Sequence, residues 1–290
     1  MNIRIITFLR NEGNIGQRLQ AFALQRFIWN NFHEKALIYD IRDSIELKNR
    51  SNLKDIVFDF DKNIWLKKIN GIEDILDDNV DYFIMGSDQI FNPVFYDNKL
   101  VRSYYTLDFI DQKKKIPYAV SSCLTFANNI KTNSISFREC ITRDDLNKIH
   151  YSSLCNDINI NIDPVFLLDK EEYSKYSVYR NEAIYQNDNN IYYYQICNNE
   201  QIESFLFKLS NYDGIIYTSS YHMFILSILY NKKIDMNYTN LYKDMRIKHL
   251  INFLGLRYSS DFRLKNYQDV KDKIYVEREK TLNYFNKYLR

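Results

Sequence analysis

Short apolar segments alternate along the chain with segments whose apolar residues recur at helical spacing, and this alternation limits the possible folds. Residues 3–8 and 36–41 have the composition of buried strands, and residues 16–29 between them place apolar side chains three and four positions apart. Together these segments make one β-α-β unit. Repetition of such units favours an α/β fold in which helices cover both faces of a mainly parallel sheet.

The alternation continues along the chain, although the pattern is weaker between residues 43 and 78. We predict strands at 82–85, 117–121, 191–196 and 214–217, and helices at 65–76, 202–209, 221–230 and 267–290. The last helix carries its apolar residues as one stripe among many charges, so we expect it to lie on the surface and to hold no chemistry.

The length of 290 residues suits two domains of ordinary size. We predict a Rossmann-like N-terminal domain at 1–175 and a Rossmann-like C-terminal domain at 176–290 that includes the terminal helix. The boundary lies in the polar stretch between about 168 and 188.

Composition and charge argue against several classes of partner. The formal net charge is only +2, so no nucleic-acid partner is expected. No window reaches the roughly 18 uninterrupted apolar residues of a membrane span, and the apolar run at the start, which contains Arg4, is too short for a secretory signal. We expect a cytoplasmic protein whose contact with the membrane, if it has one, is peripheral and at the inner face.

The sequence lacks the familiar cofactor motifs. NEGNIG at 11–16 is not the G-x-G-x-x-G of dinucleotide sites, and neither a P-loop nor an H-E-x-x-H motif occurs. No C-x-x-C pair is present either, which argues against a zinc site and a disulfide framework. We therefore predict no cofactor, no metal ion and reduced cysteines, namely Cys123, Cys140, Cys155 and Cys197.

Small polar residues follow two of the predicted strands. GSDQ at 86–89 follows the strand at 82–85, and TSS at 218–220 follows the strand at 214–217. In open parallel sheets, ligands bind beyond the carboxyl ends of the strands. These two segments are therefore the first candidates for a site.

Six segments, in order along the chain, resemble the polysaccharide pyruvyl transferase family. They are NIGQRLQAFALQ at 14–25, MGSDQIFN at 85–92, PYAVSS at 117–122, SFRE at 136–139, DPVFLL at 163–168 and TSSYH at 218–222. The resemblance implies two Rossmann-like domains that face each other across a cleft, as in GT-B glycosyltransferases. It also implies phosphoenolpyruvate as co-substrate and a sugar or lipid-linked oligosaccharide as acceptor. The chain departs from the pattern at Ser220, where some members have Arg, and at Met223, where Gly is usual.

On this resemblance the donor side of the site comprises Arg138, Thr218, Ser219, Ser220 and His222. An arginine and a helix start suit the phosphate and carboxylate of phosphoenolpyruvate, and an imidazole that titrates near neutrality suits protonation of its methylene carbon.

Each of these residues also has a structural alternative. Arg138 could form a salt bridge with Glu139 or Asp144, Thr218, Ser219 and Ser220 could cap a helix, and His222 could be a core residue.

The acceptor side is expected beyond the predicted strands at 3–8 and 82–85. Asp88 is the candidate base for a sugar hydroxyl, with capping of a turn as its structural alternative. Further acceptor-binding candidates are Asn14, Gly16, Gln20, Ser87, Gln89 and Asn92.

Two other functions remain open at the level of the sequence. A GT-B-type glycosyltransferase would place a nucleotide sugar in the same cleft, and the absence of Arg at Ser220 keeps that reading open. A non-catalytic glycan-binding protein would keep the fold without the chemistry.

Overall fold

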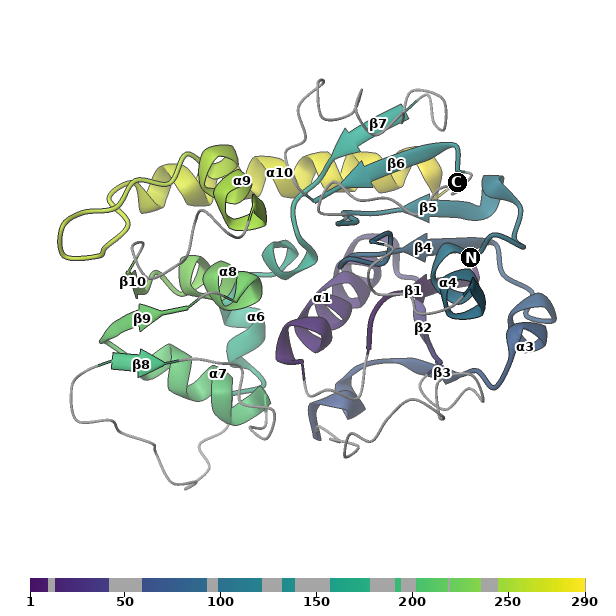
Figure 1. Ribbon diagram of the computed structural model, residues 1–290, viewed down its shortest axis with the longest axis horizontal. Coiled ribbons are helices and arrows are strands. Elements are labelled where there is room, and N and C mark those ends of the chain that lie inside the picture. The colour runs from purple at the N-terminus through teal and green to yellow at the C-terminus, as the bar shows by residue number, and fades with distance from the viewer. Residues whose placement is uncertain are drawn as a thin grey trace.

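The computed structural model describes residues 1–9, 14–41, 59–92, 99–121, 132–138, 157–177, 191–193, 202–218, 220–235 and 245–289. These residues form an α/β structure, as the alternating pattern predicts. Its two main sheets lie in separate halves of the molecule (Figure 1).

The larger half contains a five-stranded sheet in the order β3-β2-β1-β4-β5, and every neighbouring pair is parallel. The central strand β1 is buried at all four positions, as is usual where helices cover both faces of a parallel sheet. The strands are β1 (Ile3–Ile6), β2 (Leu37–Asp40), β3 (Leu66–Lys68), β4 (Tyr82–Met85) and β5 (Lys115–Pro117).

A second parallel pair, β6 (Ser134–Phe137) and β7 (Asp157–Ile160), extends this half of the molecule beyond β5. Val120 connects the two groups of strands, because it forms β-bridges with Asp88 on one side and with Phe137 on the other. The carboxyl ends of β4, β6 and β7 consequently face the same edge.

The smaller half contains the parallel sheet β10-β9-β8 and three longer helices. Its strands are β8 (Ile191–Tyr193), β9 (Ile215–Tyr217) and β10 (Lys233–Ile234), and its helices are α7 (Ile202–Asn211), α8 (Tyr221–Leu229) and α9 (Met245–Leu254). Every residue of α8 is buried, since this apolar helix packs on all sides.

Helix α1 (Ile15–Phe32) connects the two halves. Its start is capped by Asn14, whose side chain accepts a hydrogen bond from the Gln17 amide at 3.2 Å. The helix packs closely against the short 3-10 helix η5 (Pro164–Leu167), and one apolar cluster continues from α1 through η5 into α7 and α8. This shared core holds the halves together.

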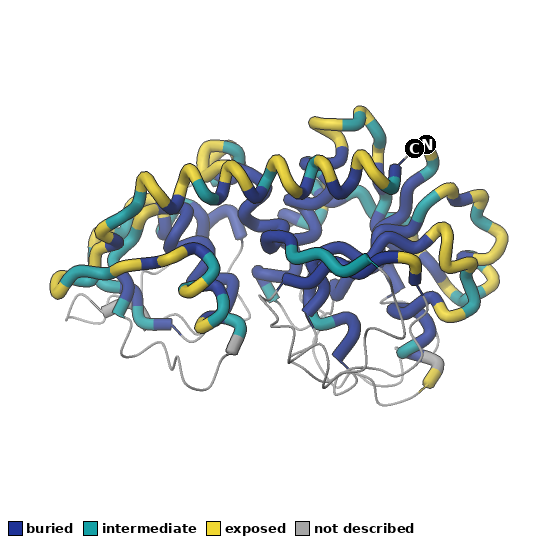
Figure 2. Tube along the Cα trace, turned by 90° about the horizontal axis from the view of Figure 1, so that it is seen from above, coloured by how far each residue is buried: buried dark blue, intermediate teal, exposed yellow. Residues whose placement is uncertain are grey.

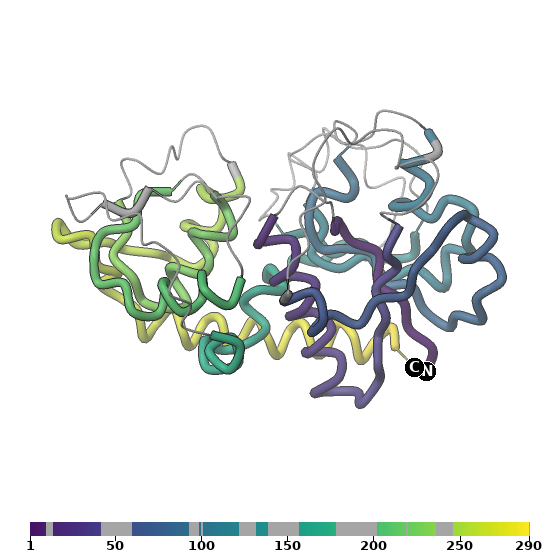
Figure 3. The backbone as a smooth tube through the Cα atoms, turned by 90° about the horizontal axis from the view of Figure 1, so that it is seen from below, coloured from purple at the N-terminus to yellow at the C-terminus, as the bar shows by residue number. Residues whose placement is uncertain are grey.

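Helix α10 (Tyr267–Tyr288) contacts both halves and lies along the outside of the molecule (Figures 2 and 3). Near its start, Tyr267 Oη donates to the Leu229 carbonyl at 3.0 Å, and near its end Tyr284 Oη donates to the Pro117 carbonyl at 2.6 Å. The predicted surface helix is therefore present, and it reaches beyond the C-terminal domain to which we assigned it. The proposed boundary between residues 175 and 176 stays a prediction.

The helix predicted over residues 65–76 is wrong in its first half. Residues 66–68 form strand β3, which pairs with β2, and only α3 (Ile72–Leu76) is helical. Three residues at a sheet edge are too few for their periodicity to distinguish strand from helix. The remaining short elements are η1 (Asp59–Asn63), α4 (Lys99–Thr106), η3 (Gln112–Lys114) and α6 (Lys170–Ser174).

Among the helices in the described ranges, none is long and apolar enough to cross a membrane. The four cysteines lie outside the described residues, so the prediction that they are reduced stays a prediction.

Candidate functional site

Gly86 allows the chain to turn sharply at the end of β4. Its φ is +124°, and a Cβ built on it would lie 2.2 Å from the carbonyl oxygen of Tyr118, so only glycine fits there. Asp88 follows with a φ of +69°, and its carbonyl accepts a hydrogen bond from the Ser121 amide at 2.9 Å. The backbone thereby places Ser87 and Asp88 at the carboxyl edge of the sheet.

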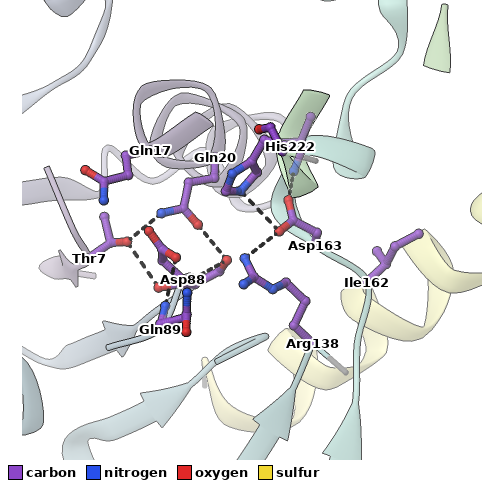
Figure 4. Close-up of polar contacts among 12 residues, drawn as sticks. Thr7, Gln17, Gln20, Asp88, Gln89, Arg138, Ile162, Asp163 and His222 are labelled. Atoms are coloured by element: carbon purple, nitrogen blue, oxygen red, sulfur yellow. Dashed lines mark hydrogen bonds and ion pairs between the residues drawn. The ribbon is translucent and has the colours of Figure 1, made fainter. Parts of the chain in front are cut away.

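Three buried side chains form a hydrogen-bond network at this edge (Figure 4). Ser87 Oγ donates to Gln20 Oε1 at 2.6 Å, and Gln20 Nε2 donates to Thr7 Oγ1 at 3.1 Å. Thr7 Oγ1 in turn donates to the Ser87 carbonyl at 3.2 Å. Ser87 and Gln20, both predicted to bind the acceptor, therefore join the loop after β4 to helix α1.

Asp88 lies next to this network and is 6% exposed. Its Oδ1 accepts a hydrogen bond from the Gln89 amide at 2.8 Å, which is the capping role given above as the structural alternative. Asn92 Nδ2 donates to Gln89 Oε1 at 3.0 Å. Asp88, Gln89 and Asn92 thus stand together at the end of β4, as their spacing in the sequence requires.

Asp163 links the ends of two strands to the smaller half of the molecule. Its Oδ2 accepts a hydrogen bond from Arg138 Nη1 at 2.9 Å and lies 3.6 Å from His222 Nε2. Its Oδ1 accepts a hydrogen bond from the Val165 amide at 2.9 Å. The side chains of Arg138 and Asp163 have no exposed surface, so this ion pair is buried (Figure 4).

The surroundings of Asp163 keep its carboxyl ionised. Burial alone raises the pKa of this group. The His222 imidazole, the Arg138 guanidinium and the Val165 amide outweigh burial, and they hold the pKa of Asp163 below its ordinary value. An ionised carboxylate therefore lies between the two basic side chains predicted to act on the donor.

Helix α1 contacts the other side of His222 through Gly16. A Cβ built on Gly16 would lie 2.3 Å from His222 Nδ1 and 2.7 Å from His222 Cβ, closer than real Cβ contacts come. The missing side chain is what lets the imidazole sit against α1. Gly16 was predicted as an acceptor-binding residue, and in the structure it supports the candidate proton donor.

Arg138 has a second contact through the aromatic ring of Tyr221. Its Cζ lies 4.5 Å from the centroid of that ring, a distance at which a guanidinium is attracted to the π face. Asp163 and Tyr221 together hold the guanidinium in place. The alternative partners Glu139 and Asp144 lie outside the described residues.

Hydroxyl groups cap the start of α8, which is the structural alternative stated above for Thr218 and Ser220. Ser220 Oγ accepts a hydrogen bond from the Met223 amide at 3.4 Å, and Thr218 Oγ1 accepts one from the Ser220 amide at 3.0 Å. Ser219 lies outside the described residues. Asn14 is likewise a helix cap in this structure.

The tertiary structure thus brings together Arg138, Gly16 and His222, which are far apart in the sequence: Asp163 contacts Arg138 and His222, and Gly16 lies against His222. Asp163 was quoted in the DPVFLL segment but was not assigned to the site. The signal available in the sequence was an acidic residue directly before the proline of a family motif, which is also a favoured helix cap. Thr7, which directly follows β1, was missed as well.

Within the described part of the chain, no group of three or more His, Cys, Asp or Glu side chains could hold a metal ion. A hollow of about 580 Å³ lies elsewhere, between α6, the end of α8 and α10, and none of the candidate site residues lines it.

These basic, acidic and hydroxyl side chains lie beyond the carboxyl ends of parallel strands, which is where open α/β sheets bind their ligands. The model of the polysaccharide pyruvyl transferase family matches residues 14–234, which is more than half of the chain. The chain belongs to this family and is therefore a transferase. Searches of curated proteins and of solved structures each found no match.

Proposed function

We propose that this protein transfers pyruvate from phosphoenolpyruvate to two hydroxyls of a sugar, as a cyclic ketal, during synthesis of a surface glycan or its lipid-linked precursor. The observation that carries the proposal is the buried contact of Asp163 with Arg138 and His222, found in a member of the pyruvyl transferase family. The contact gathers a cation and an imidazole at one end of the parallel strands.

The donor binds at Arg138 and at the start of α8. A guanidinium offers planar paired N–H donors to a carboxylate or phosphate, and the first amides of a helix attract anions. Ser220 and Thr218 sit at that helix start, with Ser219 between them in the sequence.

His222 supplies the proton that starts the reaction. It transfers this proton to the methylene carbon of phosphoenolpyruvate, and the neighbouring carbon then becomes electrophilic. Imidazole can carry a proton near neutral pH, which suits this step. Gly16 and Asp163 fix the ring from two sides, so the proton donor is already oriented.

The first sugar hydroxyl attacks this electrophilic carbon and loses its proton to Asp88. The carbon–oxygen bond to phosphate then breaks, phosphate leaves with its electron pair, and the second hydroxyl attacks the same carbon. Of the two hydroxyl protons, one replaces the proton given by His222 and the other leaves with phosphate. The products are one ketal carrying a carboxylate and one hydrogen phosphate.

Calorimetric titration with phosphoenolpyruvate, beside UDP-, GDP- and CMP-sugars, tests the donor. We expect saturable binding of phosphoenolpyruvate that is lost in Arg138→Ala. Binding of a nucleotide sugar in its place would support a glycosyltransferase. Binding of glycans alone, unchanged in Arg138→Ala and His222→Ala, would support a non-catalytic protein.

The glycan product provides the second test. Pyruvylation adds a carboxylate to each modified sugar, so the product gains negative charge and migrates differently in electrophoresis. An acceptor whose charge stays constant after incubation with enzyme and phosphoenolpyruvate would contradict the proposal.

A further inference from the structure

Arg138 and His222 alone do not supply enough positive charge at the candidate donor site to balance the negative charge of phosphoenolpyruvate. Both groups share one ionised carboxylate, that of Asp163, which cancels one positive charge. Phosphoenolpyruvate carries about two negative charges on its phosphate and one on its carboxylate near neutral pH. A further cation close to the start of α8 would balance the donor.

Arg246 stands at this position. It lies in the first turn of α9, and its Cζ is 5.2 Å from the centroid of the Tyr221 ring. The same ring holds Arg138 at 4.5 Å. Tyr221 is the first residue of α8 and follows the helix cap Ser220, so both guanidinium groups lie against the ring of the residue that begins α8.

The packing of α9 fixes this placement. Helices α8 and α9 contact each other, and Ile247 next to Arg246 is 1% exposed, so the first turn of α9 is anchored in the core. Contact with the ring attracts the guanidinium through its π face, and the N–H donors of a guanidinium lie in its plane in the forked arrangement that suits phosphate oxygens. The cation is therefore held before a ligand arrives.

We propose that Arg246 binds the phosphate group of the donor, together with the first amides of α8. This inference rests on the proposed function for the identity of the donor. Ser220 itself serves as a helix cap and carries no charge. The second cation then comes from the next helix along the chain, and reaches the same helix start across Tyr221.

The test compares Arg246→Gln with Lys248→Gln, which removes the same charge from an exposed position on the same helix. Calorimetry with phosphoenolpyruvate, inorganic phosphate and pyruvate measures the affinities. Because hydrogen bonds to charged groups are strong, we expect Arg246→Gln to lower the affinity for phosphoenolpyruvate and for phosphate about 10- to 100-fold. The affinity for pyruvate should stay unchanged. Lys248→Gln should bind all three like the wild type.

Three outcomes would overturn the inference. Wild-type affinity for phosphoenolpyruvate in Arg246→Gln would show that Arg246 does not bind the donor. Weaker binding of pyruvate but not of phosphate would place Arg246 at the carboxylate instead. An equal loss in Lys248→Gln would show a general effect of net charge.

Calorimetric titration with UDP distinguishes failure of this inference from failure of the proposed function. If the wild type binds phosphate and UDP but not phosphoenolpyruvate, the donor assignment fails. Weaker binding of UDP in Arg246→Gln would then still support a phosphate contact at Arg246. Thermal unfolding of each variant confirms that the compared proteins are folded.

Discussion

Gly16 on α1 and His222 on α8 are in direct contact, because the absent side chain of the glycine leaves the space that the imidazole fills. A Cβ at Gly16 would lie 2.3 Å from His222 Nδ1. The contact joins the two halves of the molecule at the residue proposed to donate the proton, so its disturbance should affect catalysis before it affects the fold.

Gly16→Ala should lower kcat at least about 10-fold, since displacement of a catalytic group by about 1 Å already costs up to two orders of magnitude. Alanine usually stabilises a helix relative to glycine by about 1 kcal/mol, so a lower melting temperature would itself indicate the clash. Gly71→Ala is the control, because its Cβ meets only the flexible end of Glu73. Unchanged kinetics in Gly16→Ala would refute the role of the contact.

Asp163→Asn should destabilise the fold by about 3 to 5 kcal/mol at pH 7, because it removes the negative charge from a fully buried ion pair with Arg138. Chemical denaturation measures this difference. Asp169→Asn is the control: Asp169 also pairs with an arginine, Arg278, but its side chain is 62% exposed, so we expect a loss of at most about 1 kcal/mol. Equal losses in the two variants would contradict the buried ion pair.

The effect of Asp163→Asn should depend on pH. The folded state lowers the pKa of Asp163, so the charged carboxyl contributes stability above its unfolded value near 3.8, and this contribution is lost as the pH falls through the lower folded value. Denaturation curves of wild type and variant should therefore converge below about pH 4. A constant difference from pH 7 to pH 2 would mean that charge is not involved.

Asp78 offers a second pH test away from the site. Burial raises the pKa of Asp78, but hydrogen bonds from Arg4, Lys67 and Tyr39 lower it to about 2 overall. Asp78→Asn should cost roughly 2 kcal/mol at pH 7, and the cost should disappear between pH 3.8 and about pH 2. Acid titration of unfolding measures it, and a loss that persists at pH 2 would point to packing instead of charge.

Asp88→Asn separates catalysis from donor binding. Loss of a general base typically lowers kcat by about 10² to 10⁴, whereas the affinity for phosphoenolpyruvate should stay within about twofold. Steady-state kinetics and calorimetry on the same variant give both values. Asp81→Asn, which removes an exposed carboxylate at the opposite end of β4, serves as the control. A kcat near wild type in Asp88→Asn would show that another group is the base.

The sequence alone was sufficient for several of the strands and helices and for the family. Residues 3–6, 82–85, 202–211 and 221–229 are strands and helices where the periodicity predicted them, because the spacing of apolar residues records which face of an element is buried. The family motifs likewise lie in continuous segments. Their order along the chain carries information that single residues do not.

Tertiary structure decided which of the motif residues meet. Asp163 contacts Arg138 and His222 because β6, β7 and α8 converge at one point, and the packing of α1 against η5 brings Gly16 to the same place. A single sequence records burial and local propensity but not the distance between remote side chains, since that distance is set by strand order and by helix packing. The sequence alone therefore gave no reason to assign Asp163 or Arg246 to the site, and their proposed roles follow only from the contacts they make in the fold.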